Sequence, residues 1–144
     1  MQREIQHQID IDAPPAAVWS VLTDTSAYGD WNPFVRRLEG DLQTGSKLAV
    51  EIAPPGGRAM TFKPTVLAAD APRELRWLGR LFAPRVFDGE HRFKLEALPG
   101  GGTRFTQAER FTGLLVRLFS VEKTRLGFEQ MNRALKQRAE ASAR

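Results

Sequence analysis

The sequence predicts an α+β fold in which a curved antiparallel sheet of six or seven strands wraps around one long C-terminal helix. Short runs of alternating apolar and polar residues extend from Ile5 to Phe111, a pattern typical of half-buried strands. Clusters of glycine and proline separate these runs at spacings that suit antiparallel hairpins. From Leu114 onward, apolar residues instead recur at intervals of three, four and seven, which predicts one amphipathic helix.

The composition indicates one globular domain over residues 1–144. Hydrophobic residues make up 42% and charged residues 26% of the chain, as in ordinary globular proteins. No apolar run approaches the roughly 18 residues of a membrane span, and Met1–Asp12 lacks the apolar block of a signal peptide. We therefore expect a cytoplasmic protein. The absence of cysteine excludes disulfides, thiol nucleophiles and thiolate metal sites.

The net charge of +4 comes from the C-terminal segment, where basic residues outnumber Glu122, Glu129 and Glu140. These basic residues are spread around the predicted helix without interleaved aromatic residues, which favours a solvated helix face over nucleic-acid binding. An interaction module whose basic helix meets a macromolecule is kept as a minor alternative. The basic residues of the segment are Arg117, Lys123, Arg125, Arg133, Lys136, Arg138 and the terminal Arg144.

The elements follow from local patterns. Ile5, His7, Ile9 and Ile11 mark an opening strand that Pro14 and Pro15 end, and a short helix follows from Asp12 or Ala13 because proline is favoured in a first helical turn. A second short helix or turn is expected over 28–34. Strands are expected around 35–41, 47–53, 59–69 and 74–81, followed by two long strands between 86 and 111. The glycine clusters join strand to strand, so they are not phosphate-binding loops, which precede a helix.

The C-terminal helix is expected to bury one apolar stripe. Thr112 or Ser120 is a candidate N-cap. Gly127 lies inside the stripe, where glycine costs about 1 kcal/mol relative to alanine, so we expect it to permit close approach of another backbone or to leave room for a ligand. The segment 81–84 is a candidate lid or portal. The stripe consists of Leu114, Leu118, Val121, Phe128, Met131 and Leu135.

Polar side chains share a strand face with aromatic side chains on the last two strands. Alternate residues of a strand face the same side, so His91 lies in one row with Phe87, Gly89, Phe93 and Leu95. Gln107 and Glu109 lie in another row with Phe105 and Phe111. A buried polar group without a partner costs roughly 1–3 kcal/mol. The three polar groups therefore need partners in the protein, trapped water or a ligand.

Two interpretations of a His91–Glu109 pair remain open: an internal salt bridge, which we favour, and an acid/base dyad. His7, His91 and Glu109 are the only candidate metal ligands and lack a motif-like spacing, so we expect no metal and no other cofactor. No Gly-Xaa-Ser-Xaa-Gly nucleophile motif occurs. The candidate ligand-binding residues have inward parity or lie on the helix stripe; they are Phe62, Trp77, His91, Phe93, Phe105, Gln107, Glu109, Phe111, Phe128 and Met131.

Local motifs along nearly the whole chain resemble those of the SRPBCC superfamily, which has the helix-grip fold. They are Ala13-Pro14-Pro15 followed by Val18-Trp19, Trp31-Asn32-Pro33-Phe34, Gly40 with Gly45, Leu75-Arg76-Trp77, Gly89-Glu90-His91 and Gly101-Gly102-Thr103. That superfamily includes START lipid-transfer domains, the birch-pollen allergen group and polyketide cyclases. The chain is most similar to small bacterial polyketide cyclase/dehydrase-like proteins. The resemblance implies the fold and transfers no catalytic set.

A curved sheet packed on a helix leaves residual space that becomes a pocket. We therefore expect the protein to bind a small hydrophobic or aromatic molecule, such as a lipid, quinone or polyketide-like compound, between the sheet and the C-terminal helix. The alternative is a polyketide cyclase/dehydratase-type enzyme with His91 and Glu109 as acid and base. The expected partner is a small molecule rather than nucleic acid, and the protein is expected to be a monomer or a homodimer.

Overall fold

A computed structural model describes residues 2–81, 83–118 and 121–143. Two short helices and a 3₁₀ turn lie between the first and second strands, a second 3₁₀ turn follows the last strand, and a long helix ends the described chain. The strands are β1 (Gln2–Ile11), β2 (Val35–Glu39), β3 (Ala49–Ile52), β4 (Met60–Phe62), β5 (Thr65–Asp70), β6 (Glu74–Leu81), β7 (Phe87–Ala97) and β8 (Thr103–Thr112). The helical elements are α1 (Pro15–Thr23), η1 (Thr25–Ala27), α2 (Tyr28–Trp31), η2 (Val116–Leu118) and α3 (Val121–Ser142).

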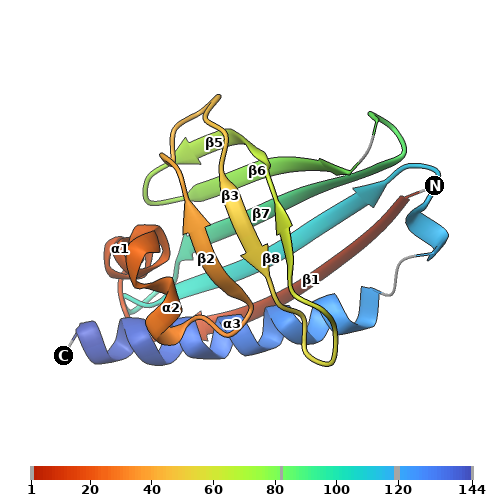
Figure 1. The fold of residues 1–144 in the computed structure, drawn as a ribbon. Helices are drawn as coiled ribbons and strands as arrows, with labels where there is room; N and C mark the ends of the chain where they lie inside the picture. Colours follow the sequence, from red (N-terminus) through yellow and green to blue (C-terminus); the bar gives the residue numbers. More distant parts are fainter. Residues whose placement is uncertain (1, 82, 119–120, 144) are drawn as a thin grey trace.

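The strands form two antiparallel sheets, ordered β1-β8-β7-β6-β5 and β2-β3-β4. Figure 1 shows α3 running along the large sheet, with the smaller sheet crossing in front and α1 and α2 near the C-terminal end of α3. This arrangement confirms the predicted α+β helix-grip fold, the antiparallel pairing and the single long C-terminal helix. None of the described helices is both long and apolar enough to cross a membrane.

The expected strand over 59–69 is wrong as a single element. It is interrupted at Lys63 and Pro64, so that β4 pairs with β3 while β5 pairs with β6 in the other sheet. Proline cannot donate a ladder hydrogen bond, and Pro64 coincides with the change of sheet. The described part of the chain therefore divides its strands between two sheets, whereas the alternation pattern predicted one.

The expected start of the C-terminal helix is also wrong. Leu114 lies in a loop after Gly113, with 76% of its surface exposed, and α3 begins only at Val121. Gly113 has a φ of 123°, a conformation that favours glycine and ends β8. Thr112 is the last residue of β8. Ser120, the other candidate cap, and Phe82 in the candidate portal lie outside the described residues.

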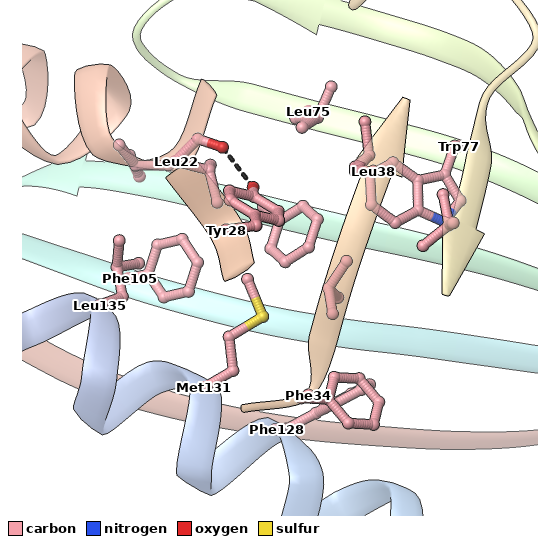
Figure 2. Close-up of a cluster of buried hydrophobic side chains, with 14 of the residues drawn as sticks. Leu22, Tyr28, Phe34, Leu38, Leu75, Trp77, Phe105, Phe128, Met131 and Leu135 are labelled. Carbon is pink, nitrogen blue, oxygen red and sulfur yellow. Dashed lines mark hydrogen bonds between the residues drawn. The ribbon is translucent and has the colours of Figure 1, made fainter. Parts of the chain in front are cut away.

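The core lies between the large sheet, α3 and the short helices. Figure 2 shows Phe105 from β8 beside Leu135 of α3, and Met131 pointing from α3 toward the sheet; all three are buried. The Tyr28 hydroxyl donates a hydrogen bond to the Leu22 carbonyl, which satisfies the polar end of a fully buried ring. Burial raises the pKa of the Tyr28 hydroxyl well above its ordinary value.

Gly127 of α3 permits a close approach, but the group that approaches is an aromatic ring and not the expected backbone. A Cβ atom at this position would lie 2.2 Å from Cδ1 of Phe34. The Phe34 ring makes an edge contact with Phe128, with centroids 5.6 Å apart. Glycine thus lets the chain just before β2 pack directly on the helix backbone.

Candidate functional site

A cavity of about 300 Å³ lies between the large sheet, the smaller sheet and the beginning of α3. Its wall is mostly apolar, and four polar or charged residues contribute to it: Arg58, His91, Glu109 and Thr124. The apolar lining includes Phe34, Val50, Ile52, Met60, Phe62, Trp77, Phe87, Phe111 and Leu115. The predicted space between sheet and helix therefore exists, and it is displaced toward the smaller sheet.

The structure divides the sequence-predicted site residues into two groups. Phe62, Trp77, His91, Glu109 and Phe111 line the cavity. The other five are buried in the described structure but lie outside that wall; they are Phe93, Phe105, Gln107, Phe128 and Met131. Strand parity indicated the inward side chains of the sheet, and helical spacing indicated Phe128 and Met131 of α3, but the cavity occupies only part of the length of the sheet.

His91 and Glu109 form a cross-strand pair. They are directly opposite in the antiparallel register of β7 and β8, where facing side chains are close enough to interact. His91 Nδ1 lies 3.1 Å from Glu109 Oε1, and the His91 side chain is almost fully buried. The interaction that the sequence predicted is therefore present as a hydrogen-bonded ion pair or as its neutral equivalent.

The second carboxylate oxygen of Glu109 faces the cavity above Gly89. A Cβ atom on Gly89 would lie only 2.5 Å from Glu109 Oε2, so the glycine makes room for this oxygen. Within the described residues, no hydrogen bond from the protein reaches Oε2. Glu109 therefore offers one hydrogen-bond acceptor to whatever occupies the cavity.

Aromatic side chains fix the orientation of the His91 imidazole. Trp77, opposite His91 in the ladder, stacks on the ring with centroids 5.2 Å apart and an interplanar angle of 29°. Phe93 and Phe128 contact the ring at centroid distances of 4.7 Å and 5.2 Å. These three contacts hold the imidazole in the orientation in which it interacts with Glu109.

Behind His91, a chain of hydrogen bonds leads away from the cavity to α3 and β1. His91 Nε2 lies 2.9 Å from Gln107 Oε1, and Gln107 Nε2 donates to Asn132 Oδ1 at 2.8 Å. Asn132 Nδ2 in turn reaches both His7 Nδ1, at 2.8 Å, and the His7 carbonyl, at 3.1 Å. Gln107 thus has protein partners and is not available to a ligand.

Sequence reasoning missed Asn132, although a signal for it was present. Asn132 is four residues after Phe128 and three before Leu135, so it lies on the apolar side of α3. A polar residue at a buried helical position indicates a specific partner. β1 lies beside β8 and places His7 opposite Gln107 in that register, and the His7 ring contacts Asn132 rather than Glu109.

The chain of hydrogen bonds ends at His7 on β1, the edge strand of the large sheet. Its Nε2 lies 3.9 Å from Glu129 Oε1 on α3. Burial lowers the pKa of His7, the charge of Glu129 raises it, and Arg133 and Arg125 lower it further. No group of three or more histidine, aspartate or glutamate side chains that could hold a metal ion is present among residues 2–81, 83–118 and 121–143.

The geometry combines an apolar chamber with one acceptor oxygen and one imidazole held behind it. Such a site can orient the polar end of an apolar molecule, or it can move a proton at Glu109. Both nitrogens of His91 are already engaged by protein groups. Glu109 is therefore the group through which the pair meets a bound molecule.

Similar proteins were found at the levels of family and fold. Among solved structures, the fold is similar to the Zhui aromatase/cyclase from Streptomyces sp. R1128, with 19% identity and a TM-score of 0.72 over 100% of this chain and 97% of that chain. It is also similar to a START superfamily protein from Mycobacterium smegmatis, with 18% identity and a TM-score of 0.74 over 96% and 98% of the two chains.

A third similar structure is larger. This chain spans half of the di-domain aromatase/cyclase BexL from the BE-7585A biosynthetic pathway, with 14% identity and a TM-score of 0.69 over 99% of this chain and 50% of that chain. No curated protein sequence matches. At these identities the structures establish the fold, and a family model matches residues 2–140. The chain belongs to the polyketide cyclase/dehydrase and lipid transport family.

Proposed function

We propose that this protein binds a small, mainly apolar or aromatic molecule that carries a hydroxyl or N–H group, with that group donating a hydrogen bond to Glu109 Oε2. The observation that carries the proposal is an acceptor oxygen without a protein partner among the described residues, set in a mostly apolar wall. The Glu109 side chain is 17% exposed, so a molecule in the cavity can reach this oxygen. A donor group on an otherwise apolar ligand would form a hydrogen bond with it there.

The size and lining of the cavity favour a compact ring system. Its volume of about 300 Å³ is at the lower end of the range of about 300–1,000 Å³ that ligand pockets occupy. Trp77, Phe87 and Phe111 present ring surfaces to it, and aromatic pairs are favourable at the edge-to-face and offset-stacked geometries that such a wall allows. A phenol or other hydroxylated aromatic compound matches both the shape and the acceptor.

Other ligands suit the site less well. The carboxylate of a fatty acid would be repelled by the Glu109 carboxylate, and the carbonyls of an oxidised quinone accept hydrogen bonds rather than donate them. The proposed ligand class therefore excludes free acids at the inner end of the cavity. Arg58 lines the cavity from the exposed β3–β4 connection. It can donate hydrogen bonds to a polar group at the outer end of the ligand.

A second candidate function is proton transfer on a polyketide-like substrate, with Glu109 as the acid or base. The specific observation in its favour is the 3.1 Å contact between Glu109 and His91, which would support a carboxyl group that changes its protonation. An enzyme of this kind would lose turnover in Glu109→Gln while still binding the substrate. A carrier would show no turnover to lose.

The binding proposal is tested with two probes of similar shape, 2-naphthol and 2-methoxynaphthalene, by fluorescence titration. Only the first donates a hydrogen bond. A hydrogen bond to a charged group contributes about 1.5–3 kcal/mol, so 2-naphthol should bind about tenfold or more tightly than the ether. Glu109→Leu should abolish this preference.

Glu90→Leu is the matched control, because Glu90 precedes His91 on β7 and faces the opposite side of the strand. It should retain the preference for 2-naphthol. Equal affinity for the two probes in the unsubstituted protein, absence of binding of both, or an undiminished preference in Glu109→Leu would each contradict the proposal.

A further inference from the structure

We propose that Gln107 and Asn132 are positioning residues that determine which nitrogen of His91 carries hydrogen, with the His7 carbonyl as the fixed end of their hydrogen-bond chain. Their effect reaches the cavity through His91 and Glu109. The inference deepens the proposed function and rests on it, since His91 in turn pairs with Glu109, the group offered to the ligand. Neither amide lines the cavity.

The direction of the chain is set at β1. A backbone carbonyl can only accept a hydrogen bond, so the group that faces the His7 carbonyl at 3.1 Å must be the amide nitrogen of Asn132. The other hydrogen of the same nitrogen points to His7 Nδ1 at 2.8 Å. Asn132 Oδ1 is thereby left to face Gln107.

Gln107 transmits this direction to His91. Its Nε2 donates to Asn132 Oδ1 at 2.8 Å, and so its Oε1 faces His91 Nε2 at 2.9 Å. An amide oxygen accepts, which requires that His91 Nε2 carries hydrogen. Gln107 and Asn132 are both fully buried, with 0% exposure, so water does not compete for these bonds.

The arrangement leaves one hydrogen between His91 and Glu109. A neutral His91 with hydrogen on Nε2 would turn a lone pair toward an ionised Glu109 at 3.1 Å, where two acceptors repel. That hydrogen therefore lies either on Nδ1, making an imidazolium and carboxylate pair, or on the Glu109 carboxyl. In both states Oε2 accepts a hydrogen bond, which is the property that the proposed ligand requires.

The tautomer of His91 can be measured directly in the ligand-free protein by long-range ¹⁵N–¹H NMR of the imidazole ring, which distinguishes nitrogens with and without hydrogen. In the unsubstituted protein, Nε2 should carry hydrogen. In Asn132→Leu, Gln107 is no longer held and can turn its amide over. The fraction of His91 with hydrogen on Nε2 should then fall.

One control separates this role from general packing. His7→Ala keeps the backbone carbonyl that fixes Asn132, so His91 should retain hydrogen on Nε2. Amide signal dispersion reports whether each variant is folded. A bare Nε2 in the unsubstituted protein, or identical ring spectra in folded Asn132→Leu and the unsubstituted protein, would overturn the inference.

The measurement on the unsubstituted protein keeps the inference testable even where a variant does not fold. It also separates this inference from the proposed function, because it requires no ligand. Failure of the naphthol titration with the expected tautomer would remove only the proposed ligand class. The opposite tautomer with the expected naphthol preference would remove only the positioning role.

Discussion

Gly89 illustrates how the absence of a side chain determines the chemistry of the cavity. It lies on β7 between Gly79 of β6 and Phe111 of β8. Since Glu109 Oε2 occupies the space where a Cβ atom would be, the carboxylate and an alanine cannot coexist in the present geometry. Gly79 differs, because the atoms nearest to its Cβ position are at 3.8 Å or more, an ordinary contact distance.

Gly89→Ala should push the end of the flexible Glu109 side chain aside, and it should lower the free energy of unfolding by about 0.5–1.5 kcal/mol, the usual net contribution of one hydrogen bond, here the one between Glu109 and His91. Gly79→Ala is the matched control, and it should leave the stability unchanged or raise it by about 0.4–1 kcal/mol through the lower entropy of its unfolded chain. Urea denaturation of both variants measures the difference. Equal stability of the two variants would show that Glu109 moves aside without cost.

At the scale of elements, the packing of α3 against the start of β2 depends on the contact between Gly127 and Phe34. Glycine costs about 1 kcal/mol in a helix relative to alanine, yet the buried Phe34 ring leaves no room for a Cβ atom. The steric cost exceeds the gain in helix propensity because the Phe34 ring cannot move away from Gly127 without disturbing its contact with Phe128. The same close packing positions the beginning of β2 against the helix.

Gly127→Ala should therefore lower the free energy of unfolding by about 1–3 kcal/mol, despite its better helix propensity. A double-mutant cycle with Phe34→Leu tests the cause. If the clash with the ring is responsible, the two substitutions should couple by about 0.5–3 kcal/mol, the magnitude typical of contacting residues. Additive effects in the denaturation curves would contradict this explanation.

Sequence patterns predicted those elements that depend on local periodicity. Alternation on β7 and β8 placed His91 and Glu109 on one inner face, and antiparallel pairing then made them neighbours. The division at Pro64 was not predicted, because apolar residues continue on both sides of it. Leu114 matched the helical spacing of α3 by chance, while the positive φ of Gly113 turns the chain before the helix begins.

At the scale of the whole molecule, hydrogen bonds among buried polar groups connect β7, β8, β1 and α3. The burial of Asn132 could be read from helical spacing, but its partners could not be predicted because they are distant in sequence: Gln107 is 25 residues away and His7 is 125 residues away. The position of the cavity along the sheet was equally beyond sequence patterns. It depends on how the two sheets diverge, and not on the parity of any one strand.

His7 makes the stability of this assembly dependent on pH. Its pKa is lowered from an ordinary value of 6.5, mainly by burial, so the unfolded chain binds a proton more readily than the folded protein. The contribution of His7 to the free energy of unfolding is therefore fully present above pH 6.5, and it is lost as the pH falls through the lowered pKa of His7 in the folded protein. Glu129 opposes the shift, while Arg133 and Arg125 reinforce it.

The stability of the unsubstituted protein relative to His7→Gln should consequently decrease when the pH is lowered from about 7.5 to about 5, the interval that spans the ordinary histidine pKa. Glutamine does not titrate, and the remaining carboxylates are shared by both proteins, so their effects cancel in the difference. Denaturation curves at several pH values supply the measurement. A difference that stays constant or grows in acid would contradict the burial of a neutral His7.

The interruption at Lys63 and Pro64 bears on how the chamber exchanges its contents. It leaves β4 at the edge of the smaller sheet, where β3 is its one partner among the described strands. The Lys123 ammonium of α3 donates a hydrogen bond to the Gly56 carbonyl at the tip of the β3–β4 hairpin. Bending only the hairpin tip outward, beyond the paired residues Ile52 and Met60, would break that hydrogen bond and leave the pairing within both sheets intact. The tip includes Pro54 and Arg58 of the cavity wall, so this movement would open the cavity on that side while the strands that carry His91 and Glu109 keep their positions.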